Sequence, residues 1–521
     1  MSNSVEKKLR KAESHLKARE FSEAEAVYKN ILERFPKNKK AIYGCLKAQA
    51  KISSKLSPSS EPSQEHMHEL INLYHGRRYE AVLSKTEVMT KLFPNSIDLF
   101  NLQGASYAGL EKYDDAIASY KYAIKIDPNY VDAHSNMGIA LHHRGSLDAA
   151  IESYNKAIKI DPHHPNTLNN MGISLKDKGE FDEAIARYKQ AIGVKPDYAD
   201  AYSNMGAILK IKGDFDGAIN YFSRAVHLEP DNASFRHSLG RAQEDMGDLS
   251  AAIESYKIVI QTKSDQADFH YDLGNALLRS GQKNAAINSY EKALEVEPGY
   301  ALADHMLASL SGKTTSTAPK EYVEDLFENY APRFEDSLVN KLRYEAPKKL
   351  ANIVFANHPE NSIGSILDLG CGTGLVGAEL KGSCSYLVGV DLSEAMLEEA
   401  RKKDAYDELA HEDITTYLSR EKLEFDYFIS ADVFIYVGDL SNIFQLIKSR
   451  NRSRGGKLIF SAEHTEKEGY FLEESGRYSH SKNYIESLCK KFGYRITYFE
   501  KADLREDKGK MLVGGFYQLA F

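Results

Sequence analysis

Three closely spaced glycines carry the clearest chemical signal in the chain. They lie in ILDLGCGTG, Ile366–Gly374, where an apolar run ends in Asp368 and continues into Gly370, Gly372 and Gly374. Glycine has no Cβ, so the backbone can turn sharply and let a ligand approach closely. The first amides of a following helix, and the positive end of its dipole, would point at that ligand. A strand, a glycine turn and a helix therefore predict a nucleotide-type cofactor site.

A dinucleotide is one candidate cofactor. Gly372–Gly377 formally fits G-x-G-x-x-G, with Asp391 at about the distance expected for an acid that binds ribose. Tyr478 and Lys482 add the Y-x-x-x-K spacing of short-chain dehydrogenases, with Tyr478 expected in a loop. However, the acid Asp368 stands where a dinucleotide strand usually stays apolar, and the T-G-x-x-x-G-x-G loop of that family is absent. A dinucleotide site would therefore account for only a few of the residues in this part of the chain.

A second candidate explains an ordered series of motifs. After LDLGCGTG come GVDLSEAML, HEDI, FDYFISADVFIYVGDL and GGKLIFSAE, at Gly389–Leu397, His411–Ile414, Phe425–Leu440 and Gly455–Glu463. In this order they resemble class I S-adenosylmethionine-dependent methyltransferases, over about residues 320–521. The resemblance implies S-adenosyl-L-methionine as the cofactor and methyl transfer as the reaction.

The resemblance also implies roles for individual residues. The turn from Gly370 to Gly374 would pack against the methionine part, with Asp368 oriented towards its ammonium. Asp391 would accept from both ribose hydroxyls, which suits a carboxylate. The other implied cofactor residues are Leu392 and Met396 beside the adenine, Asp413 at its exocyclic amine, the Ile414 amide at a ring nitrogen, and Tyr330 with Phe334 in an N-terminal lid. Plain core packing stays open for Met396, as does ordinary helix packing for the lid pair.

No catalytic base stands out. Methyl transfer is an in-line attack, so orientation and exclusion of water supply much of the catalysis, and a base is needed only for a protonated nucleophile. The candidates are Asp432, Glu463 with His464, and His480 in GRYSHS. Asp432 is equally suited to a structural or cofactor-side role, and a loop histidine is often merely solvated. The absence of an N-P-P-Y-type signature disfavours methylation of adenine or of a glutamine amide.

Alternating strands and helices must position these residues. Strands are predicted at 365–370, 386–391, 425–431 and 455–463, with a weaker one before residue 412 and a C-terminal hairpin; helices are predicted at 374–381, 394–403, 440–450 and 481–492. This order predicts a Rossmann-like α/β domain: a mostly parallel seven-stranded sheet with a C-terminal hairpin and helices on both faces. Ligands of such sheets bind at the carboxyl ends of the strands.

The first three hundred residues repeat with a period of 34. The phased positions are Gly104, Gly138, Gly172, Gly206, Gly240 and Gly274; Ala116, Ala150, Ala184, Ala218, Ala252 and Ala286; Tyr120, Tyr154, Tyr188, Phe222, Tyr256 and Tyr290; and Pro128, Pro162, Pro196, Pro230 and Pro298. The pattern resembles the tetratricopeptide repeat (TPR). One amphipathic helix pair cannot bury its apolar face alone, so the units must stack into an all-α solenoid. Six strong units span Ile97–Tyr300, and two weaker ones precede them at Val5–Asn38 and Ser63–Ser96.

The resulting organisation is α plus α/β. We expect divergent TPR-like helices at 1–52, a linker at 53–64, a TPR solenoid with a capping helix at 65–310, a second linker at 311–320 and the methyltransferase domain with its helical lid at 321–521. YAPRFEDSLVNKLRYEAP, ADVFIYVGDL and GRYSHS together look most similar to a bacterial group in which TPR repeats are linked to a methyltransferase.

A row of amides suggests what the solenoid binds. Asn136, Asn170 and Asn204 fall 34 residues apart on the helices that line the concave face of TPR arrays, and Ser238 and Asp272 continue the row. An amide both donates and accepts, so such a row suits the backbone of an extended peptide. O-linked N-acetylglucosamine transferases have a similar asparagine ladder in their TPR superhelix. The alternative is that asparagine is a common, solvated choice at this slot.

The composition limits the partners and the cellular compartment that we expect for this protein. The 67 basic and 75 acidic residues give a net charge of −8, which offers no general field for nucleic acid. No apolar run suits a signal peptide or a membrane span, and the four scattered cysteines suit neither a metal site nor a disulfide framework. A cytoplasmic protein is expected. Three hypotheses follow: a methyltransferase whose TPR arm recruits a protein or peptide, a small-molecule methyltransferase whose repeats serve assembly, and a cofactor-binding scaffold without turnover.

Overall fold

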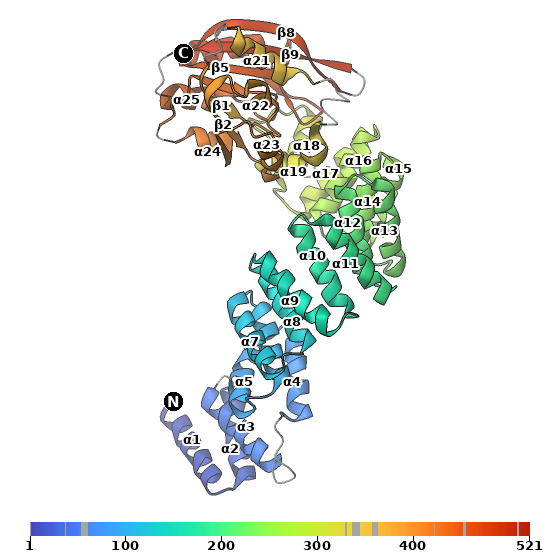
Figure 1. Cartoon of the computed structure of the whole chain (residues 1–521), viewed down its shortest axis with the longest axis vertical. Helices are drawn as coiled ribbons and strands as arrows, with labels where there is room; N and C mark the ends of the chain where they lie inside the picture. Colours follow the sequence, from blue (N-terminus) through green and yellow to red (C-terminus); the bar gives the residue numbers. More distant parts are fainter. Residues whose placement is uncertain are drawn as a thin grey trace. The chain divides into compact units, whose positions relative to one another are not determined.

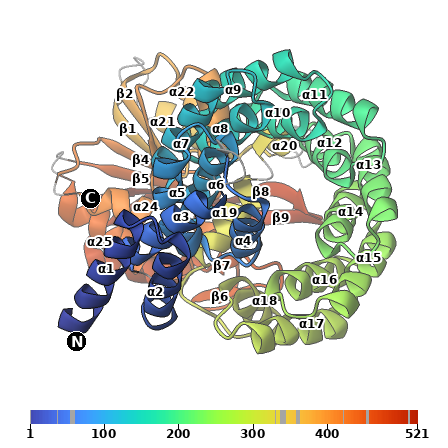
Figure 2. The same cartoon turned by 90° about the horizontal axis from the view of Figure 1, so that it is seen from below.

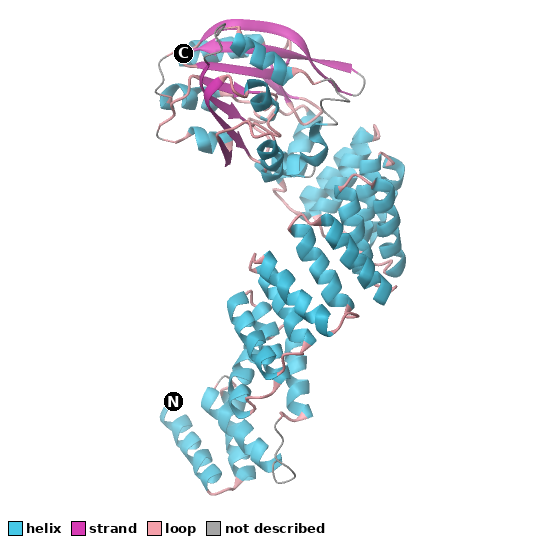
Figure 3. Ribbon diagram, viewed as in Figure 1, coloured by secondary structure: helices cyan, strands magenta, loops and turns pink. Residues whose placement is uncertain are grey.

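Helix pairs fill the first part of the chain, and a sheet with its helices fills the last (Figures 1 and 3). The computed structural model describes residues 2–36, 38–53, 61–328, 331–335, 344–356, 363–420, 422–451, 455–507 and 510–521. By internal contacts the chain divides into one unit of residues 1–208 and 224–229, and another of 209–223 and 230–521. The second unit therefore contains the last repeats together with the sheet.

The repeat helices follow the predicted period. They are α1 (Ser2–Lys17), α2 (Phe21–Arg34), α3 (Lys39–Ser53), α4 (Gln64–His75), α5 (Tyr79–Leu92), α6 (Ile97–Ala108), α7 (Tyr113–Ile126), α8 (Val131–His143), α9 (Leu147–Ile160), α10 (Pro165–Asp177), α11 (Phe181–Val194), α12 (Ala199–Ile211), α13 (Phe215–Leu228), α14 (Ala233–Met246), α15 (Leu249–Thr262), α16 (Ala267–Arg279), α17 (Lys283–Val296) and α18 (Ala301–Ser311). In the second unit, α14 to α18 succeed one another along a curve (Figure 2). None of the helices in the described ranges is long and apolar enough to cross a membrane.

One contact explains the period. In α9 the buried residues Ala150, Ser153, Tyr154 and Ala157 recur at helical spacing, so one stripe of the helix faces its neighbour. Tyr154 lies flat against Gly138 of α8, where an added Cβ would come within 2.5 Å of the ring. The glycine–tyrosine contact recurs at 104/120, 172/188, 240/256 and 274/290. Each repeat thus needs a residue without a side chain opposite its aromatic ring.

The remaining elements build the C-terminal domain. They are α19 (Lys320–Glu328), α20 (Ala331–Glu335), α21 (Ala346–Phe355), β1 (Ile363–Leu369), α22 (Leu375–Leu380), β2 (Cys384–Asp391), α23 (Glu394–Lys402), β3 (Glu408–His411), α24 (Ile414–Leu418), β4 (Tyr427–Ser430), the 3-10 turn η2 (Phe434–Tyr436), α25 (Ser441–Arg450), β5 (Lys457–His464), β6 (Tyr470–Leu472), β7 (Tyr478–His480), α26 (Lys482–Phe492), β8 (Arg495–Asp507) and β9 (Lys510–Ala520). The all-α repeats followed by a mostly parallel α/β sheet confirm the predicted fold class.

The sheet has more strands than predicted. The order is β3-β2-β1-β4-β5-β7-β6, with β9 antiparallel to β5 and to β8. Neighbours from β3 to β7 run parallel. The described residues form nine strands instead of seven, because β6 and β7 add a short antiparallel pair. The predicted loop at Tyr478 is therefore wrong: this residue begins β7.

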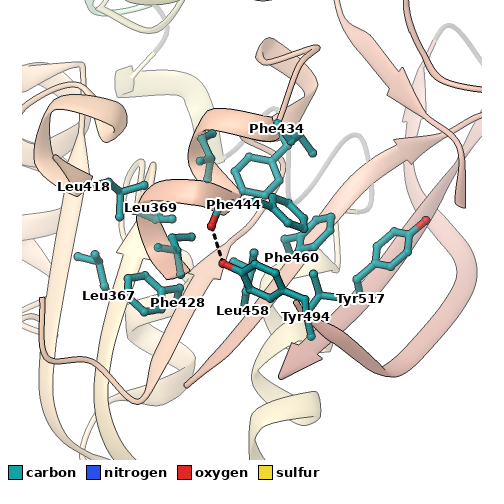
Figure 4. Close-up of a cluster of buried hydrophobic side chains, with 14 of the residues drawn as sticks. Leu367, Leu369, Leu418, Phe428, Phe434, Phe444, Leu458, Phe460, Tyr494 and Tyr517 are labelled. Carbon is teal, nitrogen blue, oxygen red and sulfur yellow. Dashed lines mark hydrogen bonds between the residues drawn. The ribbon is translucent and has the colours of Figure 1, made fainter. Parts of the chain in front are cut away.

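Helices cover both faces of the sheet. Leu367 and Leu369 of β1 face the cluster that includes buried residues of α24, α25 and α26, whereas Ile366 faces α21 and α22. In the first cluster Phe434, Phe444 and Phe460 pack together, and the Tyr494 hydroxyl donates to the Phe444 carbonyl at 2.7 Å (Figure 4). The alternating pattern of β1 fixes which side chains meet which layer.

The stretch 311–320 is bound to the C-terminal domain rather than loose. We call Thr314–Pro319 the docked segment. Asp439 N donates to the Ser316 carbonyl at 2.7 Å and Ala318 N to the Tyr436 carbonyl at 3.0 Å. Just before it, His305 of α18 hydrogen-bonds the Gly476 carbonyl through Nε2 at 2.9 Å. The other predicted linker, 53–64, lies largely outside the described residues.

Candidate functional site

A cavity of about 670 Å³ lies at the carboxyl ends of the parallel strands. Its walls come from the turn after β1, the end of β2, the start of α24 and the stretch after β4, and from α19, α20 and the docked segment. A volume of this size is ordinary for a small-molecule or cofactor site. Of the predicted cofactor residues, those lining it are Gly370, Gly372, Asp391, Leu392, Met396, Asp413 and Ile414.

The glycine turn has the backbone that its sequence requires. Gly370 has φ +71°, and an added Cβ would lie 2.3 Å from a methyl group of Val433. Gly372 has φ +55°, and a Cβ there would meet no atom within 4 Å. The first glycine thus makes room for a neighbouring side chain, and the second leaves cavity space open beside the backbone.

Asp391 is held rigidly at the end of β2. Gly372 N donates to its Oδ2 at 2.7 Å, and Ser393 N to its Oδ1 at 2.9 Å. Burial raises the pKa of this carboxyl, although the backbone amides oppose the shift. Each carboxylate oxygen can accept more than one hydrogen bond. The group can therefore accept from a pair of neighbouring hydroxyls in the cavity.

Asp413 caps a helix as well as lining the cavity. Its Oδ1 accepts from the amides of Thr415 and Thr416 and from the Thr415 hydroxyl, and Lys320 Nζ lies 3.5 Å away. Burial alone would raise its pKa, but these hydrogen bonds and Lys320 hold it below the usual value. One oxygen is therefore committed to α24, a helix that the sequence did not predict.

Asp368 and Gly374 stand behind the turn, outside the cavity lining. Alternation along β1 turns Asp368 to the face opposite Leu367 and Leu369, where it is fully buried and accepts from the Tyr406 hydroxyl at 2.6 Å. Burial raises its pKa to about 7. A Cβ on Gly374 would lie 3.1 Å from the Tyr406 ring. Asp368 does not line the cavity, and its Oδ1 has no partner among the described residues, so its contact with a cofactor ammonium stays a prediction.

Part of the predicted lid lines the cavity. Phe334 of α20 does so, together with Val323 and Phe327 of α19. The rings of Phe327 and Phe334 meet edge to face at 6.0 Å. Tyr330 lies outside the described residues. The lid wall is apolar and aromatic, which suits exclusion of water.

His480 is not placed to act as a base. Its side chain is buried in β7, away from the cavity lining, and Nε2 hydrogen-bonds the carbonyls of Val437 and Gly438, both at 3.0 Å. A ring nitrogen that faces carbonyl oxygens must carry its proton. Burial lowers its pKa to about 4. His464 is likewise outside the lining, beside Glu466 at 3.3 Å, and burial lowers its pKa.

Asp432 is the one catalytic candidate that lines the cavity. It follows β4 with φ +62°, and its amide donates to the Ser461 hydroxyl at 3.0 Å. Its carboxylate pairs with Arg505 of β8, and Arg505 also pairs with Glu463 at the end of β5. Arg477, also in the lining, pairs with Glu463 at 2.8 Å.

The asparagine row is partly used between repeats. Asn136 donates to Asn101 at 3.0 Å, and Asn204 donates to Asn169 at 2.9 Å. Asn170 is half-buried on α10. A side-chain amide has two donors and an acceptor with two lone pairs, so capacity remains at these positions.

Sequence reasoning missed the residues that come from distant segments. Tyr406 supports the glycine turn, since its hydroxyl bonds Asp368 and also accepts from Gly377 N at 3.1 Å. Lys320 and Arg505 line the cavity from the lid and from the C-terminal hairpin. No local signal marks Arg505, because β8, with the sequence RITYFEKADLRED, is rich in charged residues.

The similarities to known proteins fall on the same two parts of the chain, the repeats and the C-terminal domain. Residues 366–455 match the methyltransferase-domain family, and TPR-repeat families match 104–143, 140–179, 174–212 and 245–281, and also 199–232 and 267–300. A protein of Oceanobacillus iheyensis named as an uncharacterized methyltransferase is 33% identical over 85 residues, 16% of this chain and 39% of that protein. An uncharacterized protein of Haemophilus influenzae is 34% identical over 107 residues, 19% of this chain and 42% of that protein. The chain thus spans about two fifths of the length of these curated relatives.

Solved structures with similar repeats include YrrB, titled a TPR protein with an unusual peptide-binding site. It is 22% identical, covers 36% of this chain and 96% of its own, and aligns with a TM-score of 0.32. MamA is 29% identical, covers 31% and 94%, and aligns with a TM-score of 0.30. The family matches, together with the observed repeats and sheet, show that this chain joins tetratricopeptide repeats to a methyltransferase domain.

Proposed function

We propose that the C-terminal domain binds S-adenosyl-L-methionine in this cavity and transfers its methyl group, while the repeats recruit a protein or peptide. The observation that carries the proposal is the pairing of Gly372 with Asp391. The turn's own amide holds the carboxylate in place, and the glycine leaves open space beside it. A ribose diol lying along the turn would find a fixed acceptor for both hydroxyls.

The other residues fit the same cofactor. Leu392 and Met396 line the cavity beyond Asp391 and offer apolar surface to an adenine ring. Asp413 keeps its second oxygen for an amine donor after capping α24. Phe327 and Phe334 would close over the bound molecule and exclude water, which strengthens every polar contact inside.

When bound, the cofactor would supply a methyl group carried on a positively charged sulfur. A lone pair of the acceptor would attack the methyl carbon as the carbon–sulfur bond breaks, and the electron pair of that bond would stay on sulfur. The protein's part is to hold the acceptor in line and to keep water out. Gly370, Gly372 and Asp391 would hold the cofactor for this, and residues of the lid helices α19 and α20 line the same cavity.

Replacing Asp391 tests the cofactor assignment. We expect Asp391→Ala to weaken S-adenosylmethionine binding by about 2 kcal/mol or more, because two hydrogen bonds to a charged group are lost. Isothermal titration calorimetry on the full chain measures this. Asp407→Ala is the matched control, because Asp407 also accepts from a backbone amide of β2, Leu387 N at 2.7 Å, but lies outside the cavity lining. Parent-like affinity in the Asp391 variant would refute the proposal.

Labelled-methyl transfer tests what the repeats are for. Incubation of the full chain with a cell lysate, followed by separation of protein from small molecules, should place the label in protein. Label in the small-molecule fraction supports instead an enzyme whose repeats serve assembly, and cofactor binding without any label supports a scaffold. Replacing Asn136, Asn170 and Asn204 by alanine should reduce capture of the labelled protein if the amide row holds it.

A further inference from the structure

A carboxylate oxygen without a hydrogen-bond partner borders the cavity. Asp432 lines it, its side chain is only 10% exposed, and Oδ1 is buried with no partner among the described residues. Buried polar atoms are nearly always paired, so such an atom marks a place for a further hydrogen-bond donor. The left-handed φ of +62° at Asp432 is unusual for a residue with a side chain. Strain of this kind clusters at functional sites.

The same carboxylate is fixed from the other side. Arg505 pairs with both Asp432 and Glu463, and all three side chains are buried or nearly so. A register shift in β8 between Asp503 and Arg505 lies where this arginine turns inwards. Bulges often re-aim a side chain next to an active site. Two local irregularities, one after β4 and one in β8, therefore converge on a single ion pair.

Stability alone is a poor reason for this arrangement. Buried ion pairs recover little more than the cost of removing both charges from water. The network spans three elements, since Asp432 follows β4, Glu463 ends β5 and Arg505 lies on β8. Its effect is to fix the carboxylate of a residue that lines the cavity while leaving one oxygen, Oδ1, unshared.

The position along the sheet indicates what that oxygen meets. Asp413, Asp391 and the glycine turn follow β3, β2 and β1 in spatial order, and Asp432 follows β4 on the far side of the turn. In the proposed cofactor pose the adenine and ribose lie at the β3–β2 end. Asp432 would then lie across the glycine turn from the adenine and ribose, on the side left for a methyl acceptor.

We infer that Asp432 Oδ1 accepts a hydrogen bond from the nucleophile itself, so that the methyl acceptor is an N–H or O–H group rather than a carboxylate. The inference rests on the proposed methyl transfer. A carboxylate oxygen only accepts hydrogen bonds, so an ionised acid would meet it with repulsion. This hydrogen bond would align the N–H or O–H donor. Its lone pair would form the new bond to the methyl carbon while the carbon–sulfur bond breaks and its electron pair stays on sulfur. The proton that the donor loses would pass to Asp432 and then to solvent.

The linkage of the transferred methyl group provides a direct test. Label moved from S-adenosylmethionine into the lysate by the parent chain should survive mild alkali, because N-methyl and ether linkages are stable there. Methyl esters release methanol under the same conditions. Volatile label after alkali would overturn the inference while leaving the proposed function intact. No transferred label at all would overturn the proposed function, and the inference with it.

Asp432→Asn tests the residue. We expect transfer to fall by about 100-fold, the lower end of what a positioned proton acceptor contributes, with calorimetric affinity for S-adenosylmethionine within about twofold of the parent. Glu463→Gln is the matched control: it perturbs the same arginine but lies outside the cavity lining, so its loss should be much smaller. Equal losses in both variants, or loss of cofactor affinity in Asp432→Asn, would refute the assignment; the second result would place Asp432 on the cofactor.

Discussion

His480 should make the stability of the methyltransferase domain depend on pH. Its side chain is 1% exposed, and its Nε2 faces the carbonyls of Val437 and Gly438. Burial lowers the pKa of this imidazole from 6.5 to about 4, although the two carbonyls oppose the shift. Charging the ring therefore opposes folding.

The size of the effect follows from linkage. Below pH 6.5 the unfolded chain binds a proton at this position, whereas the folded chain binds one only below about pH 4. Stability from the neutral ring is thus fully present above pH 6.5 and is lost as the pH falls towards 4. Between pH 7 and pH 5 the loss amounts to about 2 kcal/mol.

His480→Gln removes the titration while keeping a donor, because the glutamine amide can reach the same carbonyls. The variant should lose about 2 kcal/mol less than the parent between pH 7 and pH 5. The chain has no tryptophan, so urea unfolding is best followed by hydrogen exchange in peptides that cover β7 and α26. Equal losses in His480→Gln and the parent would show that the buried ring is not the source.

Three further changes test the packing arguments. Gly138→Ala should lower the free energy of unfolding, measured by thermal melting, by about 1–3 kcal/mol, because the new methyl group meets the Tyr154 ring. A loss of less than about 1 kcal/mol would contradict the repeat contact. Gly193→Ala, in α11 with open space around it, should instead stabilise by up to about 1 kcal/mol in the same melt. Tyr494→Phe should cost about 0.5–1.5 kcal/mol in urea unfolding, since the hydrogen bond from the hydroxyl to the Phe444 carbonyl is lost, and an unchanged midpoint would argue against that bond.

The repeats could be predicted from sequence because one contact recurs many times. The contact of Gly138 with Tyr154 is one of five glycine–tyrosine contacts in the repeats. Because all five have the same spacing in sequence, the pattern cannot be mistaken for a chance match. Strands such as β2 and β5 were also foreseeable, since each has a short continuous apolar run. Strands β6 and β7 have three residues each and α24 has five, and such lengths carry no readable period.

The cavity was predictable only where its residues are close to a motif in sequence. Asp391 and Asp413 follow strands that the motifs mark. Tyr406, Lys320 and Arg505 reach the same region from other segments, and their positions follow from the topology rather than from any local pattern. His480 looked suitable for catalysis by type, but burial and its two carbonyl partners decide otherwise.

The docked segment changes where this protein can be divided. Three residues of this segment line the cavity: Ser316, Thr317 and Ala318. In α18, which precedes the segment, His305 hydrogen-bonds the Gly476 carbonyl. A catalytic fragment beginning at Lys320 would lack part of its own pocket. A fragment that keeps the whole cavity wall and its support should therefore begin at or before α18. Gain or loss of repeats before α18 could then change the surface that the solenoid presents without altering the cavity.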